Sequence, residues 1–340
     1  MKSARPKLLA IRTGAMGDVC MLVPVLRALQ QFISIDWLVN DHHAHVVRCF
    51  PELDCRLILE PSAYTRGESP FADPLVHQLQ QEGYDYCLDF SHWPDVTRLV
   101  AKLQGIPIRA IAHDPAQDLL LNVNPFGIDL YQPFNRVVEI DPMLHQIEKW
   151  QVLVETACGV SLNLSRPMPK HPVPGKVLRI FVQVHASKKI KRWPARYFAS
   201  VLRSLAWKRP VHCFVNSVPE RYAKRLERLL IFSRCKVERV TFDPTLRGLR
   251  DCLQTVDFAL GCDSGPMHFA GLLGIPTVVV YGPYPACEFR PVGRTFSVSP
   301  PGDNLPASAV LLRDVRTATN KLVEELDSGL GPPPGSIWLG

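Results

Sequence analysis

The sequence contains no long hydrophobic segment. Its apolar runs have the length of β-strands or are interrupted by charged residues, whereas a membrane-spanning helix needs about 18 consecutive apolar residues. The basic N-terminal stretch is cut short by Arg12 and a glycine-containing turn, so it does not fit a signal peptide. These absences argue against an integral membrane protein and favour a cytoplasmic one.

Paired cysteines are also missing. The ten cysteines are scattered singly, mostly inside apolar runs, and no C-x-x-C pair occurs. This pattern gives no basis for a zinc knuckle or a dithiol redox motif and is typical of buried thiols in a reducing compartment. His42, His43 and His45 follow an apolar run, and we expect them to begin a solvated helix rather than to bind a metal.

The common phosphate-binding signatures are absent as well. The sequence has neither the G-x-G-x-x-G fingerprint of a dinucleotide site nor the G-K-[ST] of a P-loop. We therefore do not expect the protein to bind a nucleotide through either of these two motifs.

Strand-like and helix-like runs alternate along the 340 residues, and the hydrophobic fraction of 46% is ordinary for a globular protein. A chain of this length is expected to form two domains, and such alternation predicts parallel sheets covered by helices. We predict an α/β protein with two Rossmann-like, doubly wound domains at residues 1–160 and 177–330, a linker at 161–176 and a tail at 331–340. Residues 113–140 lack periodicity and predict a long loop or lid.

Charge is distributed unevenly along the chain. Residues 1–158 contain 13 Lys and Arg and 19 Asp and Glu, a net charge of −6, whereas the remainder contains 26 and 13, a net charge of +13. An anionic partner is therefore expected to bind the second half. Doubly wound sheets bind ligands at the carboxyl ends of their strands, and we expect this site in the cleft between the two domains.

Residues 11–29, IRTGAMGDVCMLVPVLRAL, predict a strand, a glycine turn and a helix. The two glycines permit unusual dihedral angles, and Asp18 falls at the start of the helix. Asp18 is either an ordinary N-cap or a carboxylate at a strand end that takes a proton from a hydroxyl group.

The segment VHASKKIKRWP, residues 184–194, contains four cations in the five-residue stretch 188–192. They would repel one another without an anion, and lysine and arginine suit a phosphate as a point charge and as a planar fork. The alternative is a solvated basic loop. Because the cluster is short and has no repeated aromatic platform, we expect no nucleic acid partner.

Glu220 follows the apolar run of residues 211–216 and falls in the first turn of a predicted helix. There its carboxylate could bind ribose hydroxyls, as an acidic residue does in dinucleotide folds. The alternative is a first-turn glutamate that the helix dipole favours.

Residues 261–276, GCDSGPMHFAGLLGIP, follow an apolar run and predict a tight turn before a helix. A helix that begins in this way leaves unpaired backbone N–H groups at the positive end of its dipole, and such a place attracts an anion. The alternative is that Asp263 and Ser264 only cap their own helix.

If this turn receives a phosphate, the hydroxyl of Ser264 and the amides of Gly265 and Met267 are the expected donors. His268 lies about one turn further on and could meet the same anion. The alternative is that His268 is a buried histidine with satisfied hydrogen bonds.

In this order, the four segments resemble glycosyltransferase family 9, the heptosyltransferases that build the inner core of bacterial lipopolysaccharide. The R-x-G-A-x-G-D run of that family is matched by residues 12–18, its K-x-W-P turn by 191–194, its D-[ST]-G-x-x-H helix start by 263–268 and its [FY]-G-P by 281–283. Each motif alone is weak, but the four in order are specific.

The resemblance implies a glycosyltransferase B type fold, with the nucleotide sugar on the second domain and the acceptor on the first. It implies an inverting, metal-independent transfer, commonly of heptose from ADP-heptose as co-substrate, onto a lipopolysaccharide core or a related glycolipid or saccharide, without a further cofactor. Independently of the family, the sequence lacks the D-x-D triplet that commonly holds a metal-bound sugar diphosphate, which leaves cations and helix dipoles to stabilise the leaving group. We expect a monomer that contacts the inner face of the cytoplasmic membrane transiently.

The resemblance also implies roles for individual residues. Asp18 matches the general base, Lys191 the lysine that neutralises the diphosphate, and Glu220 the acidic residue at the ribose. The phosphate- and sugar-binding turn corresponds to Asp263, Ser264, Gly265 and His268. The glycine that usually precedes the ribose-binding acid is missing, and Tyr284 stands where the family frequently has Thr, so the donor could differ from ADP-heptose.

Two other functions remain open from the sequence. A non-catalytic nucleotide-sugar-binding protein would keep Lys191 and Asp263 but would not depend on Asp18. A serine hydrolase would use Ser264 and His268, although the G-x-S-x-G elbow is absent and no acid partner is evident.

Overall fold

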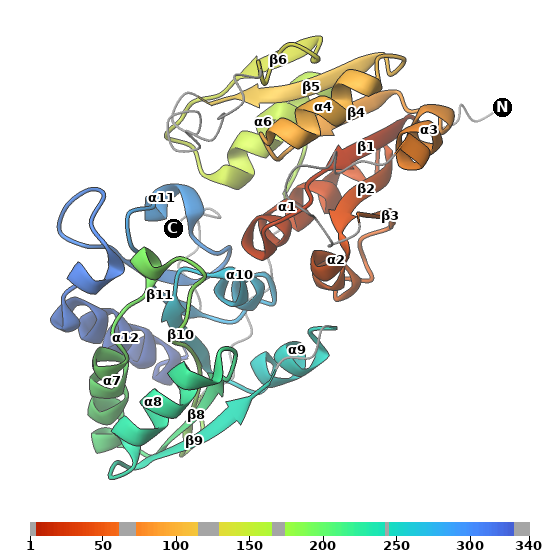
Figure 1. Ribbon diagram of the computed structural model, residues 1–340. Helices are drawn as coiled ribbons and strands as arrows, with labels where there is room; N and C mark the ends of the chain where they lie inside the picture. Colours follow the sequence, from red (N-terminus) through yellow and green to blue (C-terminus); the bar gives the residue numbers. More distant parts are fainter. Residues whose placement is uncertain (1–4, 61–72, 115–128, 165–173, 242–244, 330–340) are drawn as a thin grey trace. The chain divides into compact units, whose positions relative to one another are not determined.

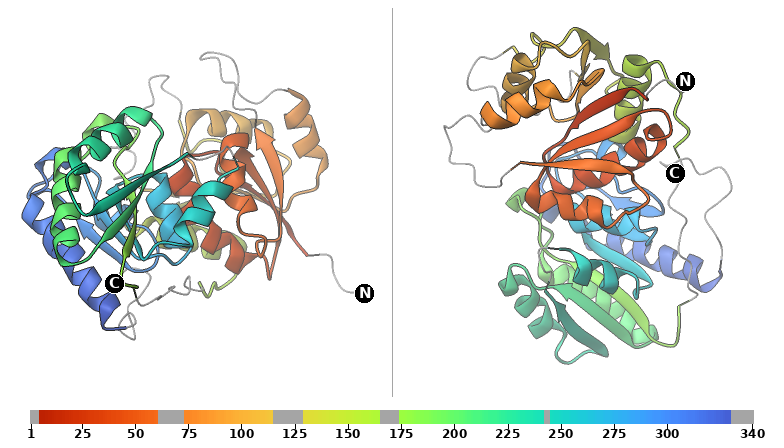
Figure 2. Two further views of the ribbon diagram at one scale, coloured as in Figure 1. Left: turned by 90° about the horizontal axis from the view of Figure 1, so that it is seen from below. Right: turned by 90° about the vertical axis from the view of Figure 1, so that its right-hand side faces the viewer.

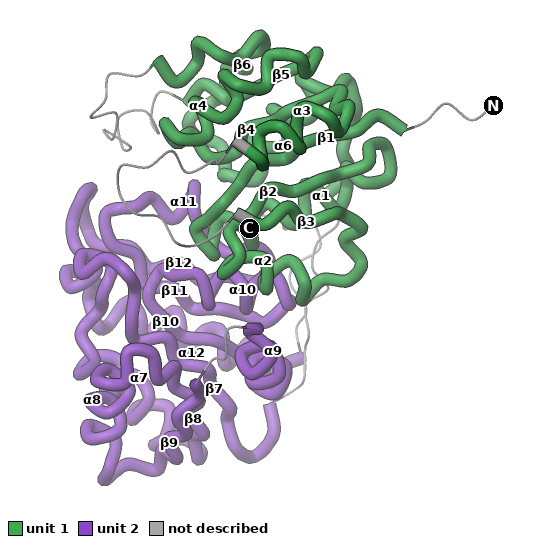
Figure 3. The backbone as a smooth tube through the Cα atoms, turned by 45° about the vertical axis from the view of Figure 1, so that its right-hand side comes forward, with its two compact units in different colours: residues 1–165 green, residues 166–340 purple. Residues whose placement is uncertain are grey.

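The computed structural model of the protein divides into two compact units, residues 1–165 (unit 1) and residues 166–340 (unit 2) (Figure 3). The residues that the structure describes are 5–60, 73–114, 129–164, 174–241 and 245–329. Most of the predicted linker and the whole predicted tail lie outside these ranges.

Unit 1 is built on a six-stranded parallel sheet with the strand order β3-β2-β1-β4-β5-β6 (Figure 1). The strands are β1 (Lys7–Ile11), β2 (Ser34–Asn40), β3 (Cys55–Glu60), β4 (Tyr86–Asp89), β5 (Ile108–His113) and β6 (Arg136–Glu139). The helices are α1 (Met16–Leu29), α2 (Asp41–Arg48), α3 (Asp73–Gln81), α4 (Pro94–Lys102) and α6 (Gln146–Cys158). Helix α1 packs against α2 and α6 on one face of the sheet, and α3 and α4 cover the other face.

Unit 2 contains a second six-stranded parallel sheet, with the strand order β12-β11-β10-β7-β8-β9. Its strands are β7 (Leu178–Gln183), β8 (Val211–Asn216), β9 (Cys235–Val240), β10 (Phe258–Cys262), β11 (Thr277–Val280) and β12 (Thr295–Val298). Its helices are η1 (Lys189–Lys191), α7 (Ala195–Lys208), α8 (Glu220–Leu230), α9 (Arg247–Leu253), α10 (Gly265–Leu272), α11 (Ala286–Phe289), η2 (Ala307–Ala309) and α12 (Leu312–Asp327). Helices α7, α8 and α12 share one core face of the sheet, and α9 and α10 lie on the opposite face (Figure 2).

Both units have the same topology. When the strands are numbered within each unit, both sheets have the order 3-2-1-4-5-6. The order reverses between β1 and β4 in unit 1 and between β7 and β10 in unit 2, and such a reversal opens a crevice at the carboxyl ends of the two strands. This architecture confirms the prediction of two doubly wound α/β domains, and it identifies the loops that follow these four strands as the places to search for function.

Three strands were not expected from the sequence. The runs at 55–60 and 295–298 were not recognised as β3 and β12, and Arg136–Glu139 lies inside the predicted loop at 113–140 but forms β6. Strands β3, β6 and β12 are three of the four outer strands, the fourth being the expected β9, and β6 has only one buried residue. Because an outer strand is paired on one side only, its sequence carries little hydrophobic periodicity, and pairing with β5 determines the conformation of β6.

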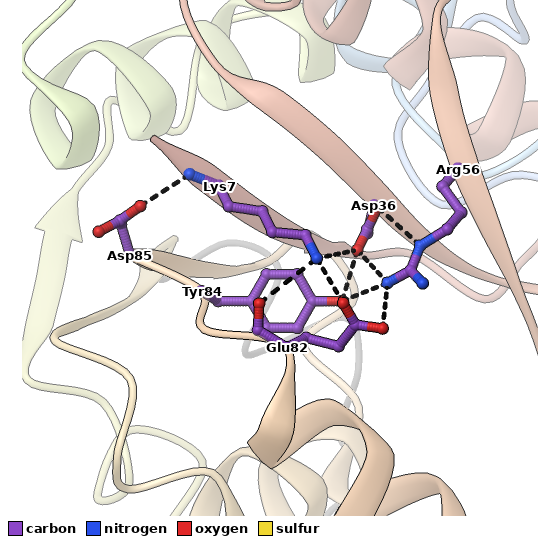
Figure 4. Close-up of polar contacts among 6 residues, drawn as sticks. All are labelled: Lys7, Asp36, Arg56, Glu82, Tyr84 and Asp85. Atoms are coloured by element: carbon purple, nitrogen blue, oxygen red, sulfur yellow. Dashed lines mark hydrogen bonds and ion pairs between the residues drawn. The ribbon is translucent and has the colours of Figure 1, made fainter. Parts of the chain in front are cut away.

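A charged cluster joins the amino-terminal halves of β1, β2 and β3 to the turn before β4 (Figure 4). The Asp36 carboxylate is 2.5 Å from the Arg56 guanidinium and 3.3 Å from the Lys7 ammonium, and it accepts a hydrogen bond of 2.7 Å from the Tyr84 hydroxyl. Glu82 pairs with Lys7 at 2.5 Å and with Arg56 at 2.7 Å. Burial raises the pKa of the Asp36 carboxyl, but Arg56, Tyr84 and Lys7 outweigh burial and hold this pKa below its ordinary value.

We expect Asp36→Ala to lower the free energy of unfolding by about 1–3 kcal/mol, because it removes the acceptor of the buried Tyr84 hydroxyl and leaves Lys7 and Arg56 with Glu82 alone from this cluster. The pKa of Asp36 is lower in the folded chain, so its contribution is complete above the ordinary carboxyl pKa of about 4 and is lost as the pH falls through the folded-state value. Urea unfolding between pH 3 and pH 7 measures both effects. The exposed pair of Asp95 with Arg98 provides the control, because Asp95→Ala should cost less than about 0.5 kcal/mol. Equal losses for the two variants would contradict a structural role for the cluster.

Candidate functional site

The carboxyl ends of β7 and β10 carry the residues predicted to bind an anion. Lys191 is the last residue of η1, in the loop that follows β7, and Asp263 and Ser264 directly follow β10. Because β7 and β10 are neighbouring strands at the reversal of strand order, their loops meet at the crevice of this sheet. The structure therefore brings together residues that are 72 positions apart in the sequence.

Lys191 and Asp263 form an ion pair at the centre of this site. The Lys191 ammonium lies 2.6 Å from Asp263 Oδ2, and the Asp263 side chain is only 3% exposed. His268 Nε2 lies 3.6 Å from Asp263 Oδ1. Burial raises the pKa of Asp263, but the contacts with His268 and Lys191 outweigh burial and hold this pKa below its ordinary value. The carboxylate is therefore ionised near neutral pH and keeps the ammonium at the strand end.

Two other cations of the basic loop, Arg192 and Lys188, have partners of their own. The Arg192 guanidinium donates to the carbonyls of Ala186 and Ser187 and to the hydroxyl of Tyr222, each at 2.7 Å, so it stabilises the loop itself. Lys188 lies 2.6 Å from the hydroxyl of Tyr284. The repulsion expected within this cluster is thus relieved by separate contacts, which leave Lys191 beside the reversal of strand order.

Tyr284 contacts two of the three lysines of the loop. The Lys188 and Lys191 ammonium groups lie 5.1 Å and 4.3 Å from the centre of its ring, within the range of a cation–π contact. Gly282, two residues before Tyr284, allows this approach, because a Cβ there would lie 2.8 Å from the carbonyl oxygen of Ile190. The loop after β11 therefore contacts the basic loop after β7 and fixes the direction of its ammonium groups.

The start of α10 differs in one detail from the prediction. The Met267 N–H donates to the carbonyl of Ser264 at 3.0 Å, so the expectation that it is free for a phosphate was wrong. The reason is that α10 begins directly after Ser264, so the Ser264 carbonyl accepts the first hydrogen bond of the helix from Met267. Gly265 is the first helical residue and has no acceptor one turn earlier, so its amide remains a candidate donor.

Ser264 and His268 do not form a nucleophile and base pair. The Ser264 hydroxyl donates to the carbonyl of Cys262 at 2.9 Å, whereas His268 Nε2 faces Asp263. His268 is buried, as the alternative interpretation expected, but its Nδ1 has no hydrogen-bond partner among the described residues. This geometry gives no support to a serine hydrolase.

Glu220 lies in the first turn of α8, after β8. Its exposed carboxylate pairs with Lys224 at 2.9 Å and with Arg239 at 3.1 Å, and the Lys224 hydrogen bond lowers its pKa. This is the arrangement of a surface glutamate near a helix start, and contact with a ribose stays a prediction.

In unit 1, Asp18 lies in the first turn of α1, after β1. Its Oδ2 accepts from the Ala15 N–H at 3.1 Å and pairs with the Arg12 guanidinium. Both contacts use the same oxygen, and the side chain is about one quarter exposed. Asp18 is therefore not the N-cap that the alternative interpretation expected: the N-cap is Ala15, and Asp18 bonds back to it from the third helical position. The same contacts orient the carboxylate at the strand end.

Sequence analysis did not assign a role to the loop after β4. Asp89 is fully buried, burial raises its pKa, and its Oδ2 has no hydrogen-bond partner in the described part of the chain. Ser91 donates from its hydroxyl to the Ile11 carbonyl at 3.3 Å, and His92 adopts a positive φ of 55°. The signal was present, because polar residues directly follow the apolar run that forms β4, at the strand beside β1.

The histidine cluster has no metal-binding geometry. His43 Nδ1 lies 3.0 Å from the Thr13 carbonyl, and its ring packs so closely on Gly14 that a Cβ there would lie 2.7 Å from it. Within the described ranges, no group of three or more His, Cys, Asp or Glu could hold a metal ion. No helix in the same ranges is long and apolar enough to cross a membrane.

Comparison with known proteins agrees with this arrangement. The chain is 24% identical over 304 residues to lipopolysaccharide heptosyltransferase 1 of Escherichia coli (strain K12), which covers 82% of this chain and 88% of the relative. Two solved structures have similar folds. A glycosyltransferase of family 9 from Veillonella parvula has a TM-score of 0.72 and 16% identity, over 96% of this chain and 99% of that one. The E. coli ADP-heptose lipopolysaccharide heptosyltransferase II has a TM-score of 0.69 and 20% identity, over 94% and 99%.

The family itself is recognised over most of the chain. Residues 74–300, which include β7 to β12 and the candidate site of unit 2, match glycosyltransferase family 9 (heptosyltransferase). This confirms the resemblance seen in the four motifs. The chain belongs to glycosyltransferase family 9 and is a glycosyltransferase that uses a nucleotide sugar.

Proposed function

We propose that the protein transfers heptose from ADP-heptose to a lipopolysaccharide core or related saccharide acceptor, with inversion and without a metal. The observation that carries this proposal is the Lys191–Asp263 ion pair beside the N-terminus of α10, at the reversal of strand order in unit 2. ADP-heptose and lipopolysaccharide appear in the names of the similar E. coli enzymes, and they support the choice of donor and acceptor.

The donor diphosphate would bind to Lys191 and to the start of α10. A lysine ammonium has three N–H donors, so Lys191 can keep its contact with Asp263 and donate to a phosphate oxygen as well. The amide of Gly265 and the helix dipole add positive charge at the same place. Lys188, which contacts the same Tyr284 ring as Lys191, supplies a second cation for the departing diphosphate.

The chemical step would use Asp18 as general base. An acceptor hydroxyl attacks the anomeric carbon from the face opposite to the diphosphate, its proton passes to Asp18, and the bond from the anomeric carbon to the diphosphate oxygen breaks. One displacement of this kind inverts the anomeric centre. The electron pair of the broken bond stays on the diphosphate, where Lys191 and the α10 dipole stabilise it.

No metal is needed for this charge balance. In the absence of a divalent cation, the leaving group requires fixed positive charge, and Lys188, Lys191 and the start of α10 supply it from one end of one sheet. The protein would act as a monomer, since each of these groups comes from a single chain.

Asp18→Asn should lower kcat at least about 10²-fold and leave the affinity for ADP-heptose unchanged, because the amide keeps the shape of the side chain but cannot take a proton. Steady-state turnover with a heptose-free lipopolysaccharide acceptor and calorimetric donor binding separate the two quantities. Asp95→Asn, a change at another first-turn acid of unit 1, serves as the control. Normal turnover of the Asp18 variant would remove this residue from the mechanism.

Lys191→Met should weaken ADP binding roughly 10- to 100-fold, the amount expected for the loss of one hydrogen bond to a charged group. Lys189→Met in the same turn should have little effect, because Lys189 is exposed and has no acidic partner in the described ranges. The double variant Lys191→Met/Asp263→Asn removes the unpaired buried carboxylate that the single change leaves. If the double variant regains ADP affinity, the loss was structural and Lys191 does not bind the diphosphate.

Among ADP-, GDP-, UDP- and dTDP-sugars, ADP-heptose should raise the melting temperature most. A ligand at 100 times its Kd stabilises the folded state by about 2.7 kcal/mol, which a thermal-shift assay resolves. The shift should be small in Lys191→Met. A larger shift with a uridine or thymidine sugar would contradict ADP-heptose as the donor, but not sugar transfer itself.

A further inference from the structure

The hydroxyl of Tyr284 receives a hydrogen bond but donates none within the described ranges. Lys188 Nζ lies 2.6 Å from this hydroxyl, and an ammonium group has N–H donors but no acceptor. The lysine is therefore the donor and the hydroxyl oxygen the acceptor. A phenol also carries one O–H proton of its own, and no described residue accepts it. The proton of this hydroxyl thus remains available for a ligand.

The position of the Tyr284 ring is set by its neighbours. Pro283 and Pro285 flank it in the sequence and restrict the backbone on both sides. The Phe289 ring of α11 packs edge-on against it, with ring centroids 6.3 Å apart, and the Lys191 ammonium lies 4.3 Å from its centre. A hydroxyl on a ring held in this way is oriented before a ligand binds, and such preorganisation is what makes a hydrogen-bond donor effective in catalysis.

The charges around this hydroxyl favour an anionic acceptor. Lys188 contacts the hydroxyl and Lys191 the ring. In the described part of the chain, Asp263 is the one acidic side chain that pairs with either lysine, and its two oxygens already face Lys191 and His268. A hydrogen bond received from an ammonium group also polarises the O–H bond and strengthens it as a donor. An anion with oxygen acceptors would therefore complete the arrangement.

We propose that Tyr284 is a further catalytic residue, whose hydroxyl donates a hydrogen bond to the departing diphosphate. The inference rests on the proposed function, because it takes the diphosphate to bind at Lys188 and Lys191. When the bond from the anomeric carbon breaks, negative charge grows on the diphosphate oxygen, and a fixed donor then stabilises the transition state more than the bound donor substrate. Tyr284 thus has two separable parts, a ring that contacts Lys191 and a hydroxyl that holds Lys188 and contacts the leaving group.

Tyr284→Phe tests the proposal, because it removes the hydroxyl and keeps the ring beside Lys191. We expect this change to lower kcat at least about tenfold and the affinity for inorganic pyrophosphate about 10- to 100-fold, the amount expected for the loss of one hydrogen bond to a charged group. Steady-state turnover and calorimetric titration in buffer with EDTA measure the two quantities. Pyrophosphate carries the diphosphate without a base or a sugar, so its binding does not depend on ADP-heptose being the donor.

A double-mutant cycle shows whether the hydroxyl acts only by holding Lys188. If it did, Tyr284→Phe would have no effect in a chain that already carries Lys188→Met. A hydroxyl that donates to the diphosphate itself makes a separate contribution. In the Lys188→Met chain, Tyr284→Phe should therefore still lower the affinity for pyrophosphate at least about fivefold, a loss that corresponds to one hydrogen bond of ordinary strength.

Tyr197→Phe is the matched control. Tyr197 of α7 is also half-buried, its hydroxyl accepts from Arg196 at 3.4 Å, and the guanidinium lies 4.7 Å from its ring centre. This change should leave kcat and pyrophosphate affinity unaltered. Normal kcat in Tyr284→Phe, or no effect of this change in the Lys188→Met chain, would overturn the inference and leave the donor site in place. If the unchanged protein did not bind pyrophosphate, the diphosphate site itself would be refuted, and the inference with it.

Discussion

The ion pair between Lys191 and Asp263 is the interaction on which the candidate site depends. A carboxylate as buried as Asp263 loses most of its hydration, and a buried charge is tolerated only when a partner compensates for that loss. Lys191 provides the compensation from the loop after β7, and His268 approaches the other oxygen from α10. The pair therefore joins the two loops at the reversal of strand order and keeps an ammonium group there before any ligand arrives. A site arranged in this way needs little reorganisation when a diphosphate binds.

The same principle operates at the equivalent place in unit 1. Arg12 directly follows β1, and its guanidinium pairs with Asp18 while donating to the Phe90 carbonyl in the loop after β4. The Arg12 guanidinium thus joins the loops that follow the two strands at the reversal of order, β1 and β4. In unit 2 the cation is proposed to meet the ligand, and in unit 1 the carboxylate. One topology used twice can therefore present opposite charges to the two substrates of a transfer reaction.

The sequence allowed the fold and the position of the site to be predicted because both depend on local patterns. Buried parallel strands appear as continuous apolar runs, and a strand end followed by glycine and a charged residue is visible without a structure. The outer strand β6 was missed because a single buried residue gives no periodicity. The partners of the charged residues could not be predicted, because the contacts of Arg192 with Tyr222 and of Lys188 with Tyr284 join segments far apart in the chain. For Asp18 the sequence left two roles open, a helix cap and a general base. In the structure Oδ2 makes the contacts with Ala15 and Arg12. The other carboxylate oxygen can still take a proton, so a contact at the helix start and a role as base are compatible.

The positive charge of the second half of the chain is not a single electrostatic feature. The net charge of +13 after residue 158 first suggested one anionic partner, but the structure divides the cations among three environments. Lys188 and Lys191 lie at the carboxyl ends of the strands, and Arg192 and Arg239 are used in contacts within the fold. Other exposed cations, such as Lys208 and Arg234, lie at the opposite end of the sheet, before β8 and β9. Because a Debye length is about 8 Å at physiological ionic strength, charges at the two ends of a sheet act on different partners. The positive charge that acts on a diphosphate at the strand ends is therefore that of Lys188, Lys191 and the start of α10, and the cations at the other end of the sheet add little to it.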